Sequence, residues 1–423
     1  MKVFKFGGAS VKDSAAVQNV SKLLARFQGD QLTVVVSAMG KTTNKLEEIV
    51  QALVNRDKNK FDSNLEELTE FHIDILGSLF VEKHFKVYQL VEETLETIAK
   101  KFNEPIPENK VFLYDQIVSL GEVLSTYILS AYLQEQGHQA KWVDARKLVR
   151  TNSNFQEGKV DWKKTEELIN QNFLPLFENN TILITQGFIG HTAEGFTTTL
   201  GREGSDYTAG IFAYCTNAES VTIWKDVPGM LNADPKYFEN TVKLDCISFK
   251  EAIELSYYGA SVIHPKTIQP LQKKNIPLYV KSFLNPEAEG TVIHQSTEND
   301  NLIPSFIIKR DQILFSFTTK DFSFIVEENL SDIFDKLTKA HVTMNLMQNS
   351  ALDFSILVDS KKVNIDAFVS LFSQDYLVKY NSNLELATIR HYNEATIAQL
   401  ILNKEVILEQ KTRHTVRLVL KEK

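Results

Sequence analysis

Short β-branched runs alternate with long amphipathic stretches, and this alternation restricts the fold of the chain more than any other feature. The runs lie at residues 3–6, 32–38, 140–145, 181–190, 220–227 and 277–283. The order is typical of a sheet with helices on both faces. Residues 33–36, TVVV, are nearly all apolar, which indicates a strand buried on both sides. We predict a three-layer α/β fold for this part.

The clearest helical stretch covers residues 111–136. Its apolar side chains recur at the spacing of one helix face and include Phe112, Ile117, Leu124 and Leu133. Gly137 follows, and glycine often ends a helix because it adopts the left-handed conformation readily. One continuous helix is therefore predicted here.

Glycine and proline divide the chain into two parts. All 17 glycines lie at or before Gly290, and all 10 prolines lie at or before Pro304. Residues 305–423 hold 15 acidic and 15 basic residues, so the net charge of −8 belongs to the first part. The polar segment 296–304 is the predicted linker. We expect one domain at 1–300 and a smaller part at 305–423.

The sequence pattern of the smaller part predicts an α+β module that occurs twice. The order strand, helix, strand, strand is predicted within residues 312–359 and again within 384–421. Residue identities between the two copies are weak. A single irregular α+β domain is therefore the alternative to a duplicated module.

Composition excludes several classes of partner. With a net charge of −8 and a pI near 5.7, the chain has no basic field to hold nucleic acid or an anionic membrane. No apolar run approaches the roughly 18 residues that a membrane span needs. Cys215 and Cys246 are the only cysteines, and we expect both to be small buried hydrophobic residues. This usage suits a reducing compartment, so a cytoplasmic location is predicted.

Common cofactor and catalytic motifs are missing from the sequence. No G-x-G-x-x-G, G-x-x-x-x-G-K-[ST] or G-x-S-x-G pattern occurs, which disfavours dinucleotide folds, Walker-type NTPases and serine hydrolases. The nine histidines show no paired-ligand spacing, so no dedicated metal site is expected.

The segment 197–209, TTTLGREGSDYTA, has the composition of an anion site. It follows an apolar run, and a helix is predicted to start near Ser205 with Asp206 in its first turn. Gly201 and Gly204 let the backbone approach a ligand, and Arg202 offers a fork for carboxylate or phosphate. A tight turn with a solvated arginine is the alternative.

Other strand ends carry weaker signals. Lys5 precedes paired glycines, an arrangement in which an ammonium group and backbone amides meet a phosphate. Residues 37–46 place Gly40 and several hydroxyls before a helix, and an ordinary helix N-terminus with a loop lysine is the alternative. Residues 224–236 form a loop long enough to wrap a nucleotide, and a plain Pro/Gly connection is the alternative. By its position alone, Glu122 is expected to be a solvated glutamate, and His264 a structural histidine.

Taken in order, these segments resemble the aspartokinases of the amino-acid-kinase superfamily. The matching segments are KFGGAS (5–10), SAMGKTTN (37–44), SLGEVLS (119–125), TQGF (185–188) with 197–209, WKDVPG (224–229) with ADPK (233–236), and YGASVIHPKT (258–267). Residues 329–359 and 407–420 resemble the paired ACT domains that follow the kinase domain. The second ACT unit resembles a truncated one, without its last helix and strand.

The resemblance implies a three-layer amino-acid-kinase sandwich and a ferredoxin-like, ACT-type regulatory part. It also implies phosphoryl transfer from MgATP to the side-chain carboxylate of L-aspartate, with Mg²⁺ bound through the nucleotide. Lys5 and Asp206 would be catalytic, and Gly7 and Gly8 would hold the transferring phosphate with Lys5. The substrate-binding positions are Ser37, Thr43, Glu122, Arg202 and Ser205, and the nucleotide loop carries Lys225, Asp226 and Lys236.

Several positions depart from the family pattern. The family commonly has Thr at Ala9, Gly at Glu203, Thr at Lys225, Tyr at Leu231, Arg at Lys236 and Lys at Ser261. The Ser261 and Lys236 departures weaken the expected ATP site, because one loses a cation and the other a bidentate fork. A catalytically weak amino-acid sensor with an impaired ATP site is therefore the alternative function.

The resemblance also bears on assembly and regulation. A homodimer through the ACT-like part is expected, and the pathway implied is lysine, threonine and methionine biosynthesis. Glu328 and Asn345 stand where the family has the Gly and Asp of its effector site, so weak or absent inhibition by lysine or threonine is predicted. A kinase for another carboxylate is disfavoured by the ACT-like tail, and a fused homoserine dehydrogenase by length and the missing dinucleotide motif.

Overall fold

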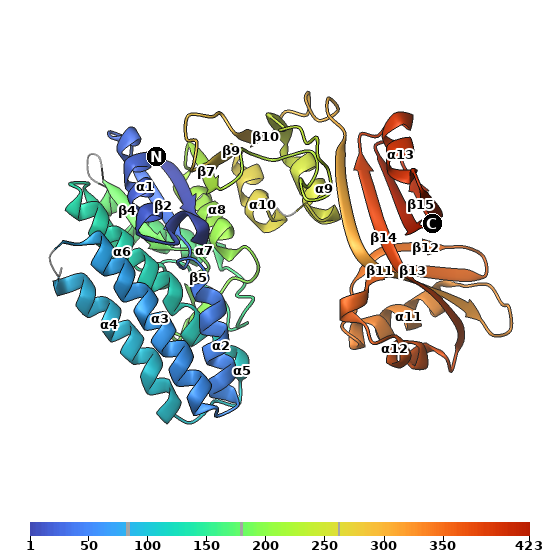
Figure 1. Ribbon diagram of the computed structural model, residues 1–423, viewed down its shortest axis with the longest axis horizontal. Coiled ribbons are helices and arrows are strands. Elements are labelled where there is room, and N and C mark those ends of the chain that lie inside the picture. Colours follow the sequence, from blue (N-terminus) through green and yellow to red (C-terminus); the bar gives the residue numbers. More distant parts are fainter. Residues whose placement is uncertain (82–84, 178–180, 261–262) are drawn as a thin grey trace. The chain divides into compact units, whose positions relative to one another are not determined.

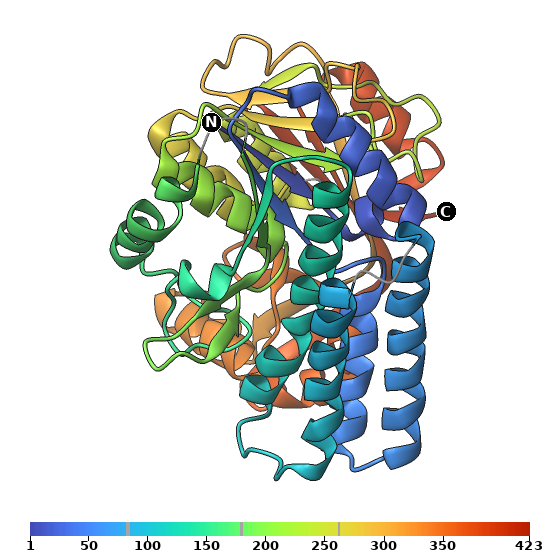
Figure 2. The same cartoon turned by 90° about the vertical axis from the view of Figure 1, so that its left-hand side faces the viewer.

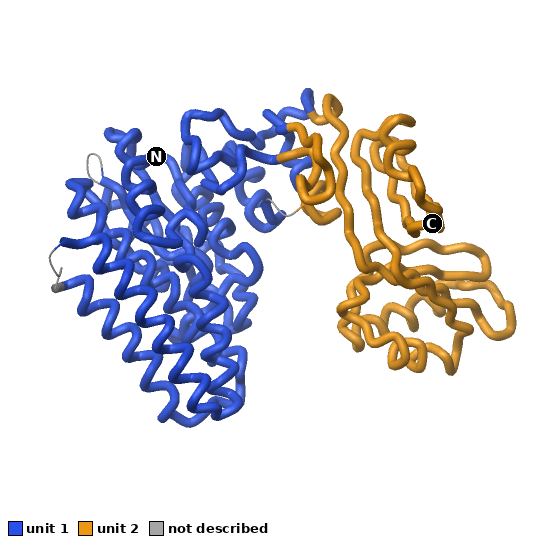
Figure 3. The backbone as a smooth tube through the Cα atoms, in the orientation of Figure 1, with its two compact units in different colours: residues 1–230, 243–253, 262–299 blue, residues 231–242, 254–261, 300–423 orange. Residues whose placement is uncertain are grey.

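A computed structural model describes residues 1–81, 85–177, 181–260 and 263–423. The chain divides into two compact units (Figure 3). Unit 1 comprises 1–230, 243–253 and 262–299, and unit 2 comprises 231–242, 254–261 and 300–423. The main change of unit falls at residue 300, close to the composition boundary. Two short segments before it also belong to unit 2, and no change of composition marks them in the sequence.

Unit 1 is built on an eight-stranded sheet. The strand order is β3-β4-β2-β1-β7-β9-β10-β8, and every neighbouring pair is parallel except β9 with β10. The strands are β1 Lys2–Phe6, β2 Leu32–Val36, β3 Ala140–Val143, β4 Ile182–Gln186, β7 Ser220–Lys225, β8 Cys246–Ser248, β9 Leu278–Ser282 and β10 Thr291–His294. Strand β2 is buried at every position, which confirms the reading of TVVV.

Helices cover both faces of this sheet (Figures 1 and 2). Helices α7 Trp162–Asn172, α8 Gly204–Thr216 and α10 Pro265–Lys274 pack together on one face. Helix α9 Phe249–Tyr258 directly follows β8 in the chain. On the other face, α6 Leu120–Glu135 contacts β2, β3 and β4. The helices that pack against α6 are α1 Ser14–Leu24, α2 Thr42–Val54, α3 Lys58–Leu79, α4 Phe85–Lys100 and α5 Lys110–Val118. The three-layer prediction is therefore correct.

The predicted helix at 111–136 is two helices, α5 and α6. The interruption is confined to Ser119, whose φ of −57° and ψ of −21° remain helical. Gly137, with φ of +82°, follows the end of α6 as predicted. The break places Glu122 in the first turn of α6. A hydrophobic pattern does not register a one-residue interruption, because the same face stays buried on both sides of it.

The Thr-rich lead to α8 is part of a second, two-stranded sheet that the sequence did not indicate. It pairs β5 Ile189–His191 with β6 Thr197–Thr199 in antiparallel register. All three threonines are buried. Threonine favours strands through its β-branched side chain, but three residues are too few to show an alternating pattern.

Unit 2 contains a six-stranded antiparallel sheet in the order β12-β13-β11-β14-β16-β15. Its strands are β11 Ser305–Thr319, β12 Met344–Asn349, β13 Asp353–Asp359, β14 Tyr376–Arg390, β15 Lys404–Lys411 and β16 Thr415–Glu422. Its helices are α11 Glu327–Lys339, α12 Ile365–Phe372 and α13 Glu394–Ile401. The order strand, helix, strand, strand occurs twice, beginning at β11 and at β14, as predicted.

The two long strands β11 and β14 run through both modules. Their pairing is interrupted between Lys309 and Gln312, where Asp311 adopts a φ of +56°, and Asn383 in β14 has a φ of +57°. One apolar cluster, with Phe315 and Phe317, lies under α11 and α12, and another, with Ile389 and Leu418, lies under α13. One sheet therefore joins both modules, with a bulge at their junction.

Candidate active site

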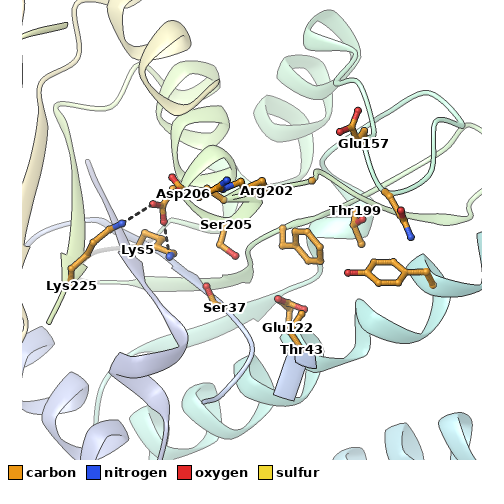
Figure 4. Close-up of a pocket in the computed structure, with 16 residues that line it drawn as sticks. Lys5, Ser37, Thr43, Glu122, Glu157, Thr199, Arg202, Ser205, Asp206 and Lys225 are labelled. Atoms are coloured by element: carbon orange, nitrogen blue, oxygen red, sulfur yellow. Dashed lines mark ion pairs between the residues drawn. The ribbon is translucent and has the colours of Figure 1, made fainter. Parts of the chain in front are cut away.

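A cavity of about 530 Å³ opens in unit 1 where several of its parallel strands end (Figure 4). Ligands of such sheets bind at the carboxyl ends of strands, because the loops that follow diverge there. The lining residues are Lys5, Ser37, Thr43, Tyr114, Glu122, Gln156, Glu157, Phe188, Thr199, Gly201, Arg202, Glu203, Gly204, Ser205, Asp206 and Lys225. All seven residues predicted as catalytic or substrate-binding are among them.

Two lysines flank the buried carboxylate of Asp206. Lys5 Nζ, from β1, lies 2.6 Å from Asp206 Oδ1, and Lys225 Nζ, at the end of β7, lies 3.5 Å from Oδ2. Burial alone would raise the pKa of Asp206, but the two lysines outweigh it and hold the pKa below its usual value. Asp206 is therefore ionised at neutral pH and fixes both ammonium groups at this end of the cavity (Figure 4).

Gly7 and Gly8 lie directly after Lys5 and do not line the cavity. A Cβ on Gly8 would come within 2.8 Å of the Ala38 carbonyl oxygen and 2.9 Å of that of Gly40. The glycine therefore lets the end of β1 approach the turn after β2. This close approach brings Lys5 and Ser37, both cavity residues, from neighbouring strands to one place.

Glu122 is buried, in contrast to the solvated position expected from its place on the helix. One carboxylate oxygen accepts a hydrogen bond from the backbone N–H of Ala38 at 3.3 Å, and the other has no hydrogen-bond partner among the described residues. Burial raises its pKa to about 8. Such a group favours a cation beside it, because a buried carboxylate needs a partner to stay charged.

The start of α8 brings Arg202, Glu203 and Ser205 to the cavity. Gly187 makes this possible, since a Cβ there would lie 2.5 Å from that of Ser205. The amides of the first turn of a helix have no intrahelical partner and carry the positive end of its dipole. With the guanidinium of Arg202 beside them, this edge of the cavity attracts anions.

Glu203 occupies a backbone conformation that glycine prefers. Its φ of +53° and ψ of +28° lie in the left-handed region, which explains why this position suits Gly. One oxygen of its carboxylate is buried without a hydrogen-bond partner among the described residues. Burial and the neighbouring Asp206 raise its pKa, while Lys225 and Arg202 oppose that rise. A second acidic group therefore lies close to the lysines.

Three residues that line the cavity lie outside every segment singled out for function in the sequence: Tyr114, Gln156 and Glu157. Phe188 and Thr199 also line it; they belong to the segments 185–188 and 197–209 but were given no role there. Two cavity residues, Gln156 and Thr199, are held by one buried carboxylate, that of Asp115. It accepts hydrogen bonds from Gln156 N–H at 2.9 Å, Thr199 N–H at 2.9 Å and the Thr199 hydroxyl at 2.8 Å. Helix α5 and the loop at 154–157 meet β6 only in the folded chain, so no sequence motif marks Tyr114, Gln156 or Glu157.

Four other positions considered in the sequence do not line the cavity or lie outside the described residues. Asp226 is exposed in the turn after β7 and does not line the cavity. Lys236 and Leu231 belong to unit 2, and Lys236 is exposed. Ser261 lies outside the described residues.

The two cysteines differ. Cys215 is buried as expected, and burial raises the pKa of its thiol to about 12. Cys246 is only half-buried, with its sulfur 2.7 Å from His294 Nε2, so the expectation of two buried cysteines was wrong for it. It lies on β8, the edge strand of the sheet, which pairs with β10.

His264 is structural, as expected. Its Nδ1 accepts a hydrogen bond from the backbone N–H of Lys266 at the start of α10, a capping role.

The described residues hold no cluster of three or more His, Cys, Asp or Glu side chains suited to a metal ion. Among the helices of the described ranges, none is long and apolar enough to span a bilayer.

Comparison with known proteins connects this cavity to a family. Residues 1–282 match a sequence model of the Amino acid kinase family. Lysine-sensitive aspartokinase 3 of Escherichia coli is 33% identical over 359 residues, which cover 85% of this chain and 78% of that protein. The chain belongs to the aspartokinase family. Chloroplastic aspartokinase 3 of Arabidopsis thaliana is 31% identical over 85% of this chain and 65% of its own length.

A solved structure extends the likeness to the fold. The crystal structure of E. coli aspartokinase III in complex with aspartate and ADP superposes with a TM-score of 0.81 and 27% identity, over 100% of this chain and 96% of that one. The chain is thus an aspartate kinase with an amino-acid-kinase domain and a sheet-rich regulatory part. The resemblance carried by the sequence motifs is confirmed.

Proposed function

We propose that this aspartate kinase transfers the terminal phosphoryl group of MgATP to the side-chain carboxylate of L-aspartate in the cavity of unit 1. The products are 4-phospho-L-aspartate and ADP. The arrangement of charge along the cavity carries the proposal. Lys5, Lys225 and Asp206 gather at one end, and Glu122 lies away from them, with Ser37 and Ser205 between (Figure 4).

The lysine end suits the phosphates. Phosphoryl transfer asks the protein mainly to hold two anions in line and to stabilise charge on the transferring group. Lys5, fixed by Asp206 at 2.6 Å, supplies a cation there without reorganisation during the reaction. The backbone of Gly7 and Gly8 would approach the same phosphate. When bound with the nucleotide, Mg²⁺ would neutralise phosphate charge.

The other end suits the amino acid. The unpartnered oxygen of Glu122 is a site for the ammonium group of aspartate, whose charge would restore ionisation of the buried carboxylate. Arg202 is suited to bind a carboxylate of the substrate through its planar fork. Ser37, Thr43 and Ser205 offer hydroxyls that orient the substrate between them.

The remaining nucleotide contacts rest on the family resemblance alone. Lys225 lines the cavity, whereas Asp226 and Lys236 do not. We propose Asp226 and Lys236 as contacts of the nucleotide outside the phosphate end. A homodimer through unit 2, a cytoplasmic location and a role in lysine, threonine and methionine biosynthesis are proposals on the same footing.

The direct test is an assay with MgATP, L-aspartate and hydroxylamine, which traps an acyl phosphate as its hydroxamate. We expect hydroxamate to form with aspartate, and Arg202→Ala to lower kcat/KM for aspartate at least tenfold, since a charge-assisted contact is worth about 1.5–3 kcal/mol. Arg202→Lys is the control, as it keeps the charge and loses the fork. No product at saturating ATP would favour the alternative, an amino-acid sensor with an impaired ATP site.

A further inference from the structure

Tyr114 lines the cavity from a part of the chain that none of the family-like segments covers. It lies on α5, and its half-buried side chain makes one polar contact: the hydroxyl donates a hydrogen bond to Glu47 Oε1, on α2, at 2.7 Å. This distance is typical of a hydroxyl bonded to an ionised carboxylate, and such bonds are stronger than those between neutral groups. Burial and the carboxylate of Glu47 raise the pKa of Tyr114, so the hydroxyl stays protonated and donates.

The carboxylate of Glu47 is committed to this contact. Lys45, two residues earlier on α2, pairs with Glu48 and Glu67 instead. Among the described residues, Tyr114 is the group that hydrogen-bonds Glu47. The aromatic ring is therefore held at both ends, by the backbone of α5 and by a side chain of α2. It cannot change rotamer without breaking a charge-assisted bond, so it forms a rigid part of the cavity wall.

The position of Glu47 places this wall at the end of the cavity away from the lysines. Thr43 lines the cavity from the first turn of α2, and Glu47 follows four residues later on the same helix face, about 6 Å further along the axis. Helix α2 leads away from the sheet (Figure 1). Figure 4 shows Thr43 and Glu122 together, with Ser37 between them and Lys5. The ring bonded to Glu47 therefore lies at the amino-acid end.

A rigid wall at this end limits how far a substrate can retreat from the phosphate. With its ammonium group at Glu122 and a carboxylate at Arg202, aspartate presents its side-chain carboxylate to the lysine end. Glutamate is one methylene longer, so it must move back by about one carbon–carbon bond to place its side-chain carboxylate for in-line attack. A misplacement of about 1 Å can cost about 100-fold in rate. The wall opposes that backward movement, whereas a mobile side chain would permit it.

We propose that Tyr114 is a specificity-determining residue of this kinase: held by Glu47, its ring closes the amino-acid end of the cavity and excludes glutamate, which is one methylene longer than aspartate. Glu47 is a positioning residue that acts through Tyr114. The inference rests on the proposed function, because it places the amino acid between Glu122 and the lysine end of the cavity.

The test compares kcat/KM for L-aspartate and L-glutamate, measured with the full chain at saturating MgATP in the hydroxamate assay. We expect the parent to favour aspartate about 100-fold, and Tyr114→Ala to lower that ratio about tenfold by raising kcat/KM for glutamate. Tyr114→Phe keeps the ring and loses the bond, so the ratio should fall about threefold. General damage to folding or to the phosphate end lowers both constants together and leaves the ratio unchanged.

A double-mutant cycle tests whether Glu47 acts through Tyr114. Glu47→Ala should lower the ratio as much as Tyr114→Phe does, and the double variant should lower it no further, because both changes remove the same bond. Glu48→Ala is the matched control, since Glu48 is the exposed neighbour on α2 and should leave the ratio unchanged. If Tyr114→Ala folds poorly, Tyr114→Leu keeps apolar volume in the wall and still shortens the side chain.

The outcomes separate two failures. If the ratio is the same in the parent, Tyr114→Ala and Tyr114→Leu, or if the parent phosphorylates glutamate as readily as aspartate, the role of Tyr114 is overturned while the kinase assignment stands. If the losses from Glu47→Ala and Tyr114→Phe add in the double variant, the link between the two residues is overturned. If the parent forms no hydroxamate with aspartate, the proposed function itself is overturned, and this inference with it.

Discussion

At the scale of single residues, burial decides what the charged groups of this cavity can do. Asp206 and Glu122 are both fully buried carboxylates, yet their pKa values move in opposite directions. Asp206 has two lysines beside it, whereas Glu122 has one backbone hydrogen bond and a distant Lys5. The first is a permanent anion that holds cations. The second is a carboxyl group whose charge depends on a ligand.

This difference leads to a prediction for Glu122. Its pKa is about 8 in the folded, ligand-free protein, so an ammonium ligand must displace a proton below that pH. We expect kcat/KM for aspartate to rise as the pH increases from 6 to 8. Glu122→Gln should raise KM for aspartate by about 10- to 100-fold and abolish that rise. Initial-rate kinetics at several pH values would check this, and an unchanged pH profile in the variant would contradict it.

The raised pKa of Glu122 also affects how the stability of the folded protein changes with pH. The carboxyl of Glu122 loses its proton near its ordinary pKa of 4.5 in the unfolded chain and near 8 in the folded one. Between these values the folded state binds more protons, so this group makes the protein less stable as the pH rises. Glu122→Gln lacks that dependence. The Tm of Glu122→Gln minus that of the parent should therefore increase as the pH rises from 5 to 8.

At the scale of elements, the cavity wall depends on residues that never touch its contents. Asp115 lies on α5 and joins β6 to the loop at 154–157 through three hydrogen bonds. Gln156, which takes part, has a positive φ of 65°. Elements that are distant in the sequence are thus held by one side chain. Their positions set Thr199, Gln156 and Glu157 at the cavity.

We predict that Asp115→Ala destabilises unit 1 by roughly 2 to 4 kcal/mol, because it leaves three donors, two of them buried, without their acceptor. It should also raise KM for aspartate, since the wall it supports is displaced. Urea denaturation and initial rates would measure the two effects. Asp62→Ala, on the exposed side of α3, is the matched control and should change neither. An Asp115→Ala variant as stable as the control would refute the role.

Unit 2 shows the same dependence on polar contacts. The side chain of Asn345, on β12, accepts a hydrogen bond from Lys309 Nζ at 2.9 Å and donates to Gln312 at 2.7 Å and Asp359 at 3.0 Å. These contacts lie beside the bulge where the two modules meet. The amide is thus committed to the interior of the sheet rather than to a ligand.

At the scale of the whole molecule, this arrangement supports the prediction of weak feedback control. The E. coli relative is named for its sensitivity to lysine, but Asn345 and Glu328 replace the Asp and Gly of the family pattern in this chain. We expect lysine and threonine at 1 mM to leave aspartate kinase activity unchanged within twofold. Hydroxamate assays with each amino acid would show this. An inhibition constant in the micromolar range for either would contradict it.

The sequence by itself determined much of this protein. β-branched runs and helical periodicity predicted the three-layer α/β fold, because a strand buried on both faces of a sheet needs consecutive apolar residues. The order of glycine-rich strand ends identified the family, and it named Lys5, Thr43, Arg202 and Asp206 as cavity residues. Each of these motifs is a short continuous segment, so it can be recognised in the sequence without the fold.

Only the tertiary structure decided the rest. It buried Glu122, which a helix pattern alone had left in solvent, and it brought Asp115 and Gln156 to the cavity wall from separate elements. It also set Glu203 and Lys225 beside the same carboxylate. Desolvation and charge interactions depend on distance in space, and spacing along the chain does not report that distance. The sequence therefore shows which types of residue line this cavity, but only the fold determines their pKa values.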